Sequence, residues 1–352
     1  MITRLSLAEA AASPAWASLC GPADLFCTPA WLEVERAGVG PWVPREAACL
    51  TWSDADGIAA GTTAQVFNGS VTDDTVRLDL MLPAPVTLDR ALLCGTWFNS
   101  SVLHDPVRAP AHARLEVAEA AVAFGASRDV DAVYFPYVDA ADTDLRKALA
   151  ELGFLEFPAP DRHVFPTHYA DYDEFLGSLR SHRRTRLRKE LSVVASANLT
   201  TAATVVDDSN VEQLSLLAHL LERKYEQQST LDELTGWFAE IARRIEVVAF
   251  TAAPAGEDPF GMSLWLRHHD LLYGFHAGFD YSRAGGLPLY TLVGYHLPIQ
   301  HACADPGLSA LEYGISSDDA KRLRGTTALP QVLAVRGMTD SVTSALSAMS
   351  PQ

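Results

Sequence analysis

The sequence predicts a mixed α/β protein of two domains, and three observations lead to this prediction. The chain has 352 residues, of which 48% are apolar and 20% charged, so it can form two buried cores. Residues 112–157 read as helix, strand, helix and strand in turn, an α/β pattern. Residues 245–279 contain three consecutive strands, with Asp270 at the tight turn of a hairpin. Each half should therefore hold a sheet flanked by helices.

In the N-terminal half, two residues mark helix ends. Pro29 fits the first position of a short helix within residues 21–37. Gly153 fits the position just after a helix over residues 143–152. The other elements expected in this half are strands near residues 46–51 and 76–82, a helix over 112–124, a strand over 132–138, and a strand formed by 154–157 with 163–166.

A Pro-Ala-Pro stretch at residues 158–160 marks the passage between the halves. We therefore expect domains at 1–160 and 161–340, followed by a tail at 341–352. Asp171 then reads as an N-cap, with Glu174 three residues later as in a capping box. The elements expected after it are helices over 209–227 and 231–244, strands over 245–252, 260–268 and 271–279, a helix over 288–304, a strand over 308–315 and a loop over 316–330.

The segment from Tyr172 to Glu190, YDEFLGSLRSHRRTRLRKE, is strongly basic in a chain whose formal net charge is -17. On a helix, Arg180, Arg184 and Arg188 would stack on one face, four residues apart. Such like charges destabilise an isolated helix, so a bound anion, with phosphate matching the Arg fork best, would explain them. The alternative is a solvated face paired with nearby carboxylates. Arg183 belongs to the same candidate substrate-binding set.

Bulk composition excludes several classes of protein. The sequence has no apolar run of 18 residues and no convincing signal peptide, so we expect a cytoplasmic protein without a membrane span. Its five scattered cysteines form no CxxC motif, which argues against disulfides and a metal site. The acidic balance argues against binding DNA, but it leaves room for a local contact with the end of a tRNA.

The basic segment and the segment LLYGFHAGFDYSRAGGLPLYTLVGYHLPIQHACADPGLSALEYGISSDDAKRLRGTTALP resemble the FemAB-like branch of the GNAT acyltransferase superfamily. The similar features are a basic F-x-x-L-x-S-x-x-R-x-x-x-R-K helix, a Y-G-x-x-x-G strand and a K-x-x-R-G loop, over about residues 165–330. The resemblance implies two tandem GNAT-like domains, each a mixed, mostly antiparallel sheet flanked by helices. Members of the family attach an amino acid from aminoacyl-tRNA, or an acyl group from acyl-CoA, to an amine.

The resemblance also assigns roles by position. Arg184 and Arg188 fall on the helix that contacts a phosphate-bearing substrate, and Lys321 falls on the lysine of the terminal loop. His276 departs from the aromatic or Arg residue more usual in its strand, which leaves its role open. At the place of the CoA phosphate loop stand Arg283, Gly285 and Gly286. The glycines are shifted there and a proline follows them, which weakens CoA binding and leaves a simple turn as the alternative.

Four residues are catalytic candidates. Lys321 could steady an oxyanion or a phosphate, or be a solvated loop lysine. Glu312 could accept the amine proton and Tyr313 could donate to the leaving group, although strand alternation lets only one of them face a cleft. His276 is either catalytic or a hydrogen-bonded core histidine.

Aromatic residues are the remaining candidates for substrate binding, with core packing as the alternative for each; they are Tyr225, Trp265, Tyr290 and Tyr295.

We therefore expect an N-acyltransferase that uses aminoacyl-tRNA as donor and a small-molecule amine as acceptor, of natural-product or cell-wall type. Charged tRNA would be a partner through its acceptor end, and no further cofactor is expected. Antibiotic biosynthesis is one setting that the resemblance suggests. The first alternative is an N-acetyltransferase dependent on acetyl-CoA or another acyl-CoA, and the second is a non-catalytic, ligand-binding GNAT pair. The acceptor, the transferred group and the oligomeric state do not follow from the sequence.

Overall fold

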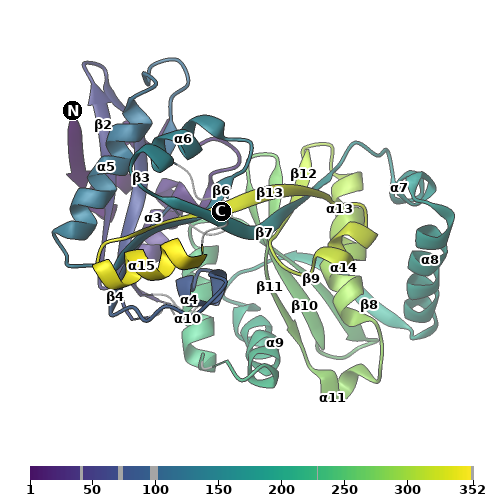
Figure 1. The fold of residues 1–352 in the computed structure, drawn as a ribbon. Coiled ribbons are helices and arrows are strands. Elements are labelled where there is room, and N and C mark those ends of the chain that lie inside the picture. The colour runs from purple at the N-terminus through teal and green to yellow at the C-terminus, as the bar shows by residue number, and fades with distance from the viewer. Residues whose placement is uncertain (40–42, 70–73, 96–101, 228, 350–352) are drawn as a thin grey trace. The chain divides into compact units, whose positions relative to one another are not determined.

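The computed structural model describes residues 1–39, 43–69, 74–95, 102–227 and 229–349 (Figure 1). The chain divides into two compact units. The first unit comprises Met1–Asp161 and Leu329–Gln352, and the second comprises Arg162–Ala328. Residues 340–349, placed in the second domain and its tail by the sequence prediction, form helix α15 and belong to the first unit.

The first unit is a mixed, mostly antiparallel sheet with helices packed on it. Its strand order is β1-β2-β3-β4-β6-β13, with β5 paired to β3, and only the β4–β6 pair is parallel. The strands are β1 (Ile2–Leu5), β2 (Glu46–Asp54), β3 (Gly57–Asn68), β4 (Arg90–Cys94), β5 (Leu103–His104), β6 (Ala132–Asp139) and β13 (Thr327–Gly337). The helices are α1 (Leu7–Ala11), α2 (Pro14–Ala17), the 3-10 turn η1 (Leu25–Cys27), α3 (Pro29–Arg36), α4 (Leu78–Met81), α5 (Ala113–Ala126), α6 (Thr143–Glu151) and α15 (Asp340–Met349).

The second unit has the same kind of sheet, in the order β7-β12-β11-β10-β9-β8. Only β11 and β12 run parallel to each other. Its strands are β7 (Leu155–Pro166), β8 (Leu199–Val205), β9 (Val247–Pro254), β10 (Gly261–His268), β11 (Leu271–Phe279) and β12 (Ala310–Gly314). Its helices are α7 (Tyr172–Ser178), α8 (Ser181–Ser196), α9 (Val211–Lys224), α10 (Leu231–Ala242), α11 (Tyr281–Ala284), α12 (Leu289–Thr291), the π-helical turn η2 (Leu292–His296), α13 (Leu297–Ala304) and α14 (Asp318–Leu323).

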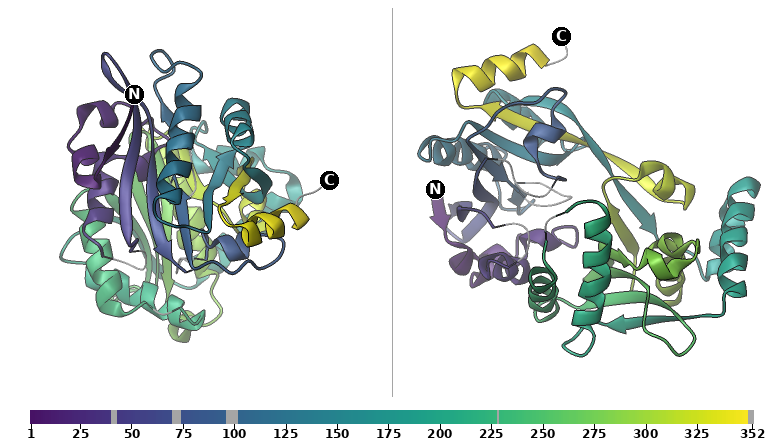
Figure 2. Two further views of the ribbon diagram at one scale, coloured as in Figure 1. Left: turned by 60° about the vertical axis from the view of Figure 1, so that its left-hand side comes forward. Right: turned by 90° about the horizontal axis from the view of Figure 1, so that it is seen from below.

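Helices cover both faces of the second sheet, as the turned views of Figure 2 show. Gly278 of β11 lies so close to the backbone of α9 that an added Cβ would stand 2.4 Å from the nitrogen of Ala218. On the other face, Ser263 of β10 donates a hydrogen bond of 2.6 Å to the carbonyl of Val293 in η2. Because side chains alternate along a strand, α9 and η2 cover opposite faces.

The structure corrects two expectations from the sequence. Residues 78–81 form helix α4 and not a strand; Arg77, which precedes the helix, pairs with Asp79 in its first turn. The alternation of apolar and polar residues over 76–80 was too short a pattern to separate helix from strand. The strand expected in two pieces, 154–157 and 163–166, is one continuous strand, because β7 runs through the Pro-Ala-Pro stretch on its more exposed portion. The stretch nevertheless lies next to the boundary between the units, as the sequence predicts.

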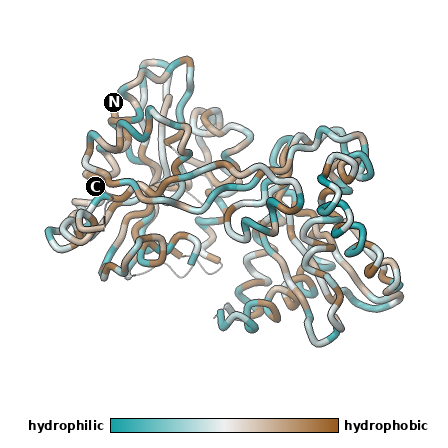
Figure 3. The backbone as a smooth tube through the Cα atoms, turned by 45° about the vertical axis from the view of Figure 1, so that its right-hand side comes forward, coloured by the Kyte–Doolittle hydropathy of each residue, from teal (hydrophilic) through white to brown (hydrophobic). Residues whose placement is uncertain are grey.

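Hydrophobic and hydrophilic residues are both distributed over the two units (Figure 3). The core of the first unit lies between α5, α6 and the sheet, and the core of the second lies between α7, α8, the η2 region and the sheet. Within the described segments, no helix is long and apolar enough to cross a bilayer.

Candidate active site

The two parallel strands of the second unit separate partway along their length. β11 and β12 pair from Leu271 and Ala310 up to Tyr273 and Glu312, and β11 then continues alone on that side to Phe279. A register shift between β10 and β11 leaves Phe275 as an extra residue just past the point of separation. The side chains that follow this point on β12 and the next turn therefore define the candidate site.

Glu312 and Tyr313 stand at this end of β12 and point to opposite faces. The Glu312 side chain is 7% exposed, and its Oε1 lies 3.4 Å from Nη1 of Arg162. The Tyr313 ring stacks on Tyr295 with centroids 5.0 Å apart and meets Trp265 edge to face. The expected alternation is therefore present, and Glu312 lies on the face that holds Arg162, opposite the face of Tyr313.

The turn after β12 brings Lys321 back toward this strand end. Ser316 and Ser317 both have positive φ angles, 67° and 55°, which is an unusual conformation for residues other than glycine. The turn leads into α14, and Nζ of Lys321 donates hydrogen bonds to the carbonyls of Gly314, at 3.0 Å, and Ile315. Lys321 is only 4% exposed, so it is not a solvated loop lysine.

Burial gives Lys321 and Glu312 unusual acidities. It lowers the pKa of Lys321 to about 7, against the opposing effects of Asp318 and Glu312. It raises the pKa of Glu312 to about 7, against the opposing effects of Arg162 and Lys321. Two groups that exchange protons near neutral pH suit general acid and base chemistry.

A second group of buried polar residues, the Glu190 cluster, comprises Glu190, Arg324, His296 and Tyr172. Nη2 of Arg324 lies 3.2 Å from Oε2 of Glu190, and its guanidinium also lies over the ring of Tyr295, 4.5 Å from the centroid. Nε2 of His296 lies 3.1 Å from Oε2 of Glu190, and its Nδ1 is hydrogen-bonded to the hydroxyl of Tyr172 at 2.5 Å. A neutral imidazole that donates to the carboxylate and accepts from the tyrosine satisfies every partner.

The surroundings of Glu190 favour its ionised form. Burial acts to raise the pKa of Glu190, but the hydrogen bond from His296 and the charge of Arg324 outweigh it and hold that pKa below its usual value. Burial also raises the pKa of the Tyr172 hydroxyl, which therefore stays protonated. The cluster joins α8 to α14 and to η2, a π-helical turn of a kind often found at functional sites.

The basic segment is broken into two helices. Arg180 has extended backbone angles and is the N-cap of α8, so only Arg184 and Arg188 share a helical face. Nη1 of Arg184 donates to the carbonyls of Gly177 and Leu179, both at 3.1 Å, and so holds the end of α7. The stacking of three guanidinium groups expected from the sequence is therefore wrong.

The remaining arginines lie at the surface. Nη1 of Arg183 donates to the carbonyl of Arg322 at 3.1 Å, which links α8 to α14. Arg180 and Arg188 are exposed, and neither has an ion-pair partner in the described part of the chain. The arginines of α8 thus present charge at the surface and do not line the described pocket.

The other residues predicted for the site are spread over the second unit. Trp265 is 2% exposed and donates to Ser263, so it belongs to the core. Tyr225 is 64% exposed at the end of α9. The hydroxyl of Tyr290 lies 3.3 Å from that of buried Tyr295.

His276 and the glycine turn make their contacts with residues other than Lys321 and Glu312. Nε2 of His276 lies 3.2 Å from Oε1 of Glu222 on α9. Arg283 binds Glu257 and nearby carbonyls, while Gly285 and Gly286 have φ angles of 56° and 82°. These glycines form a turn whose backbone requires positive φ.

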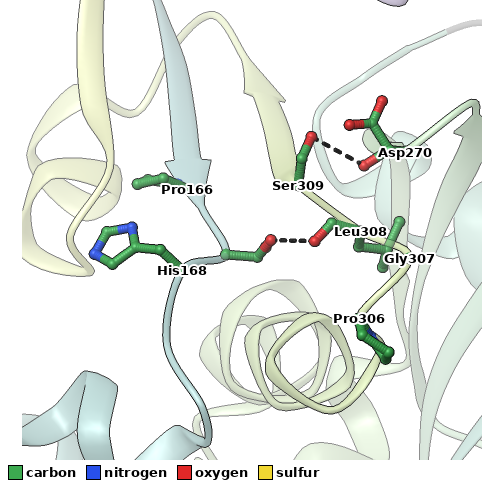
Figure 4. A pocket seen from close by; sticks show the side chains of 8 residues that line it. Pro166, His168, Asp270, Pro306, Gly307, Leu308 and Ser309 are labelled. Carbon is green, nitrogen blue, oxygen red and sulfur yellow. Dashed lines mark hydrogen bonds between the residues drawn. The ribbon is translucent and has the colours of Figure 1, made fainter.

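One pocket, of about 320 Å³, is lined by Pro166, Thr167, His168, Asp270 and residues 306–309 (Figure 4). In Figure 4, Ser309 donates to the carbonyl of Asp270, and Thr167 bonds to Leu308. Leu308 and Ser309 precede β12, whereas Glu312 and Tyr313 end it, so the pocket lies at the other end of this strand. Its lining includes none of the perturbed acids and bases, and we do not assign the chemistry to it.

Comparison with known proteins identifies the family of the chain. The model of the FemAB-like family, described as peptidoglycan biosynthesis/recognition, matches residues 100–349. The chain belongs to the FemAB-like family. A search of curated proteins finds no match.

Solved structures confirm the fold of this FemAB-like chain. FemX covers 98% of this chain and 99% of its own, at 11% identity and a TM-score of 0.63. A tandem GNAT protein from the clavulanic acid biosynthesis pathway covers 96% and 98%, at 12% identity and a TM-score of 0.54. L-PGS from Bacillus licheniformis covers 86% and 90%, at 9% identity and a TM-score of 0.54. The tandem GNAT-like fold is thereby confirmed, and family membership confirms the acyltransferase class.

Sequence reasoning missed several residues of the FemAB-like site. Arg324 and Glu190 were not singled out, although Arg324 follows Lys321 by three residues in the K-x-x-R-G loop. Arg162 gave no signal, because its partner Glu312 lies 150 residues away in the sequence. Within the described residues, no group of three His, Cys, Asp or Glu side chains is placed to hold a metal ion.

Proposed function

We propose that this FemAB-like protein transfers an aminoacyl group from aminoacyl-tRNA to the amine of a small-molecule acceptor of cell-wall or natural-product type. The observation that carries the proposal is the pair Lys321 and Glu312, both buried and both with a pKa of about 7, where β11 and β12 separate. Membership of a family described by peptidoglycan biosynthesis/recognition supports a cell-wall amine as acceptor.

The reaction forms a C–N bond and breaks the ester C–O bond that joins the aminoacyl group to the tRNA. The attacking amine must lose a proton, and the leaving oxygen of the tRNA must gain one. In this proposal the carboxylate of Glu312 accepts the amine proton, and the ammonium of Lys321 donates a proton to the leaving oxygen. Near neutral pH, both groups reach the required states at small cost, since their pKa values are about 7.

The exposed arginines of α8 supply the contact with tRNA in this proposal. Arg180 and Arg188 are free to bind phosphate, and Arg183 links their helix to the carbonyl of Arg322, next to Lys321. A local basic surface of this kind fits a contact with the acceptor end of the tRNA, whereas the acidic chain as a whole does not fit an extended nucleic-acid interface.

Acyl-CoA is the alternative donor, and one observation favours it. Beyond Tyr273, no strand among the described residues pairs with β11 on that side, so an extended donor that carries amide groups could add along this edge. Against this, Pro288 has no backbone N–H, and α12 behind the glycine turn is only 3 residues long.

The test compares the two donors directly. The protein is incubated with a protein-free metabolite extract and either tRNA charged with labelled amino acids or labelled acetyl-CoA. We expect a labelled small-molecule product from charged tRNA that is lost after RNase treatment. Product from acetyl-CoA alone would replace the proposal with the alternative, and no product from either donor would favour a non-catalytic GNAT pair.

A further inference from the structure

Glu222 and His276 face each other across the contact between α9 and β11. Gly278 packs against the backbone of Ala218, as described above, which fixes the helix on the strand. Glu222 lies four residues after Ala218 on the same helical face, and His276 lies two residues before Gly278 on the same strand face. Their side chains are 6% and 18% exposed, and Nε2 of His276 lies 3.2 Å from Oε1 of Glu222.

Hydrogen bonding shows that this pair holds an extra proton. Nδ1 of His276 lies 2.9 Å from the carbonyl of Ala277, which can only accept, so Nδ1 carries a proton. The contact between Nε2 and Oε1 then needs a second proton, either on the imidazole or on the carboxyl. In both cases the other oxygen, Oε2 of Glu222, remains an acceptor.

Oε2 of Glu222 is buried and accepts no hydrogen bond from the described residues. Glu222 is 5% exposed and lies in the last turn of α9, where the helix dipole also opposes a carboxylate. A buried acceptor without a donor is costly, and a leucine or methionine would fill the same space without that cost. The unpaired Oε2 is a cost to stability, which points to a ligand that donates a hydrogen bond to it.

We propose that Oε2 of Glu222 binds an N–H group of the amine acceptor, with His276 holding the carboxyl in position. This ligand assignment rests on the proposed function, because an amine is the N–H donor that an N-acyltransferase must bind. Oε2 of Glu222 is itself buried, and the His276 side chain, which is 18% exposed, is the part of the pair that reaches the surface. In this proposal a small amine approaches Oε2 beside His276.

The test uses two cations of equal charge, methylammonium with N–H groups and tetramethylammonium without them. Histidine ring nitrogens are followed by NMR in the full-length protein, and His276 is assigned with the variant H276Q. We expect a saturable shift of the His276 signals with methylammonium and none with tetramethylammonium. Equal shifts with both cations, or no shift with either, would overturn the proposal without any recourse to variants at Glu222.

Variants at Glu222 sharpen the result. In E222Q the amide can donate to Nε2 of His276 and leave its oxygen as acceptor, so the response should persist. In E222M the acceptor is gone, and the apparent Kd for methylammonium should rise at least about tenfold. E212M, at an exposed position of the same helix, is the control. This binding assay needs no tRNA, so its failure is distinguishable from a failure of aminoacyl transfer.

Discussion

Replacing Lys321 with methionine separates its role in catalysis from its effect on stability. In the folded protein burial lowers the pKa of Lys321 from 10.5 to about 7. Between these values the unfolded chain binds a proton that the folded protein does not, so the contribution of Lys321 to folding stability rises with pH. The cost of burying Lys321 to the free energy of unfolding is fully present below about pH 7 and vanishes above about pH 10.5.

Proton linkage gives the size of the change in unfolding free energy with pH. From about pH 8 to about pH 9.5, wild type should gain roughly 2 kcal/mol of unfolding free energy relative to K321M. This window lies above the pKa of Glu312, so the other perturbed group contributes little. K321M also loses two hydrogen bonds, to the carbonyls of Gly314 and Ile315. Their loss lowers the unfolding free energy of the variant by an amount that does not depend on pH. The difference between pH values is therefore the diagnostic quantity.

The assay is urea unfolding of wild type, K321M and the control K147M, whose lysine is exposed on α6. K147M should follow the wild-type pH dependence, and K321M should not. The same K321M protein should lose at least about tenfold in kcat, or about 1.4 kcal/mol. Parallel curves for wild type and K321M would refute the burial argument, and full activity would remove Lys321 from the site.

Three further predictions concern the neighbouring groups. Glu312→Gln should lower kcat at least about tenfold, because the carboxylate is the acting base. It should also remove the rise of kcat with pH through about 7, and an unchanged pH profile would exclude that role. Arg188→Ala should raise KM for charged tRNA and make KM less dependent on salt concentration. Because the side chain is exposed, the melting temperature should not change, and unchanged kinetics would count against the phosphate contact. Arg324→Leu should cost about 3 kcal/mol in urea unfolding, because it removes the buried cation that faces the Glu190 carboxylate and leaves mainly the hydrogen bond from His296. Adding Glu190→Gln should restore part of the loss, and simple additivity of the two changes would argue against the ion pair.

Local sequence signals predicted much of the second unit. The side chain of Asp171 caps α7 as expected, and the hairpin of β10 and β11 turns at His269 and Asp270. Both depend on short-range chemistry that a sequence displays directly. The unit boundary also lies next to the Pro-Ala-Pro stretch, although the strand continues through it.

Contacts between residues far apart in the sequence could not be predicted from local sequence patterns. The break between α7 and α8, where Leu179 and Arg180 are both extended, changed which arginines share a helical face. The partner of Glu190 lies 134 residues away, so no spacing rule could pair it with Arg324. Burial of Lys321 depends on the turn through Ser316 and Ser317, whose positive φ angles no sequence pattern indicated.

Transfer of labelled amino acid from charged tRNA, followed side by side for wild type, K321M and K147M, tests the central claim most directly. We expect an RNase-sensitive product with wild type and K147M, and at least about a tenfold loss with K321M. Equal product from all three proteins, or a wild-type product that survives prior RNase digestion of the donor, would contradict it.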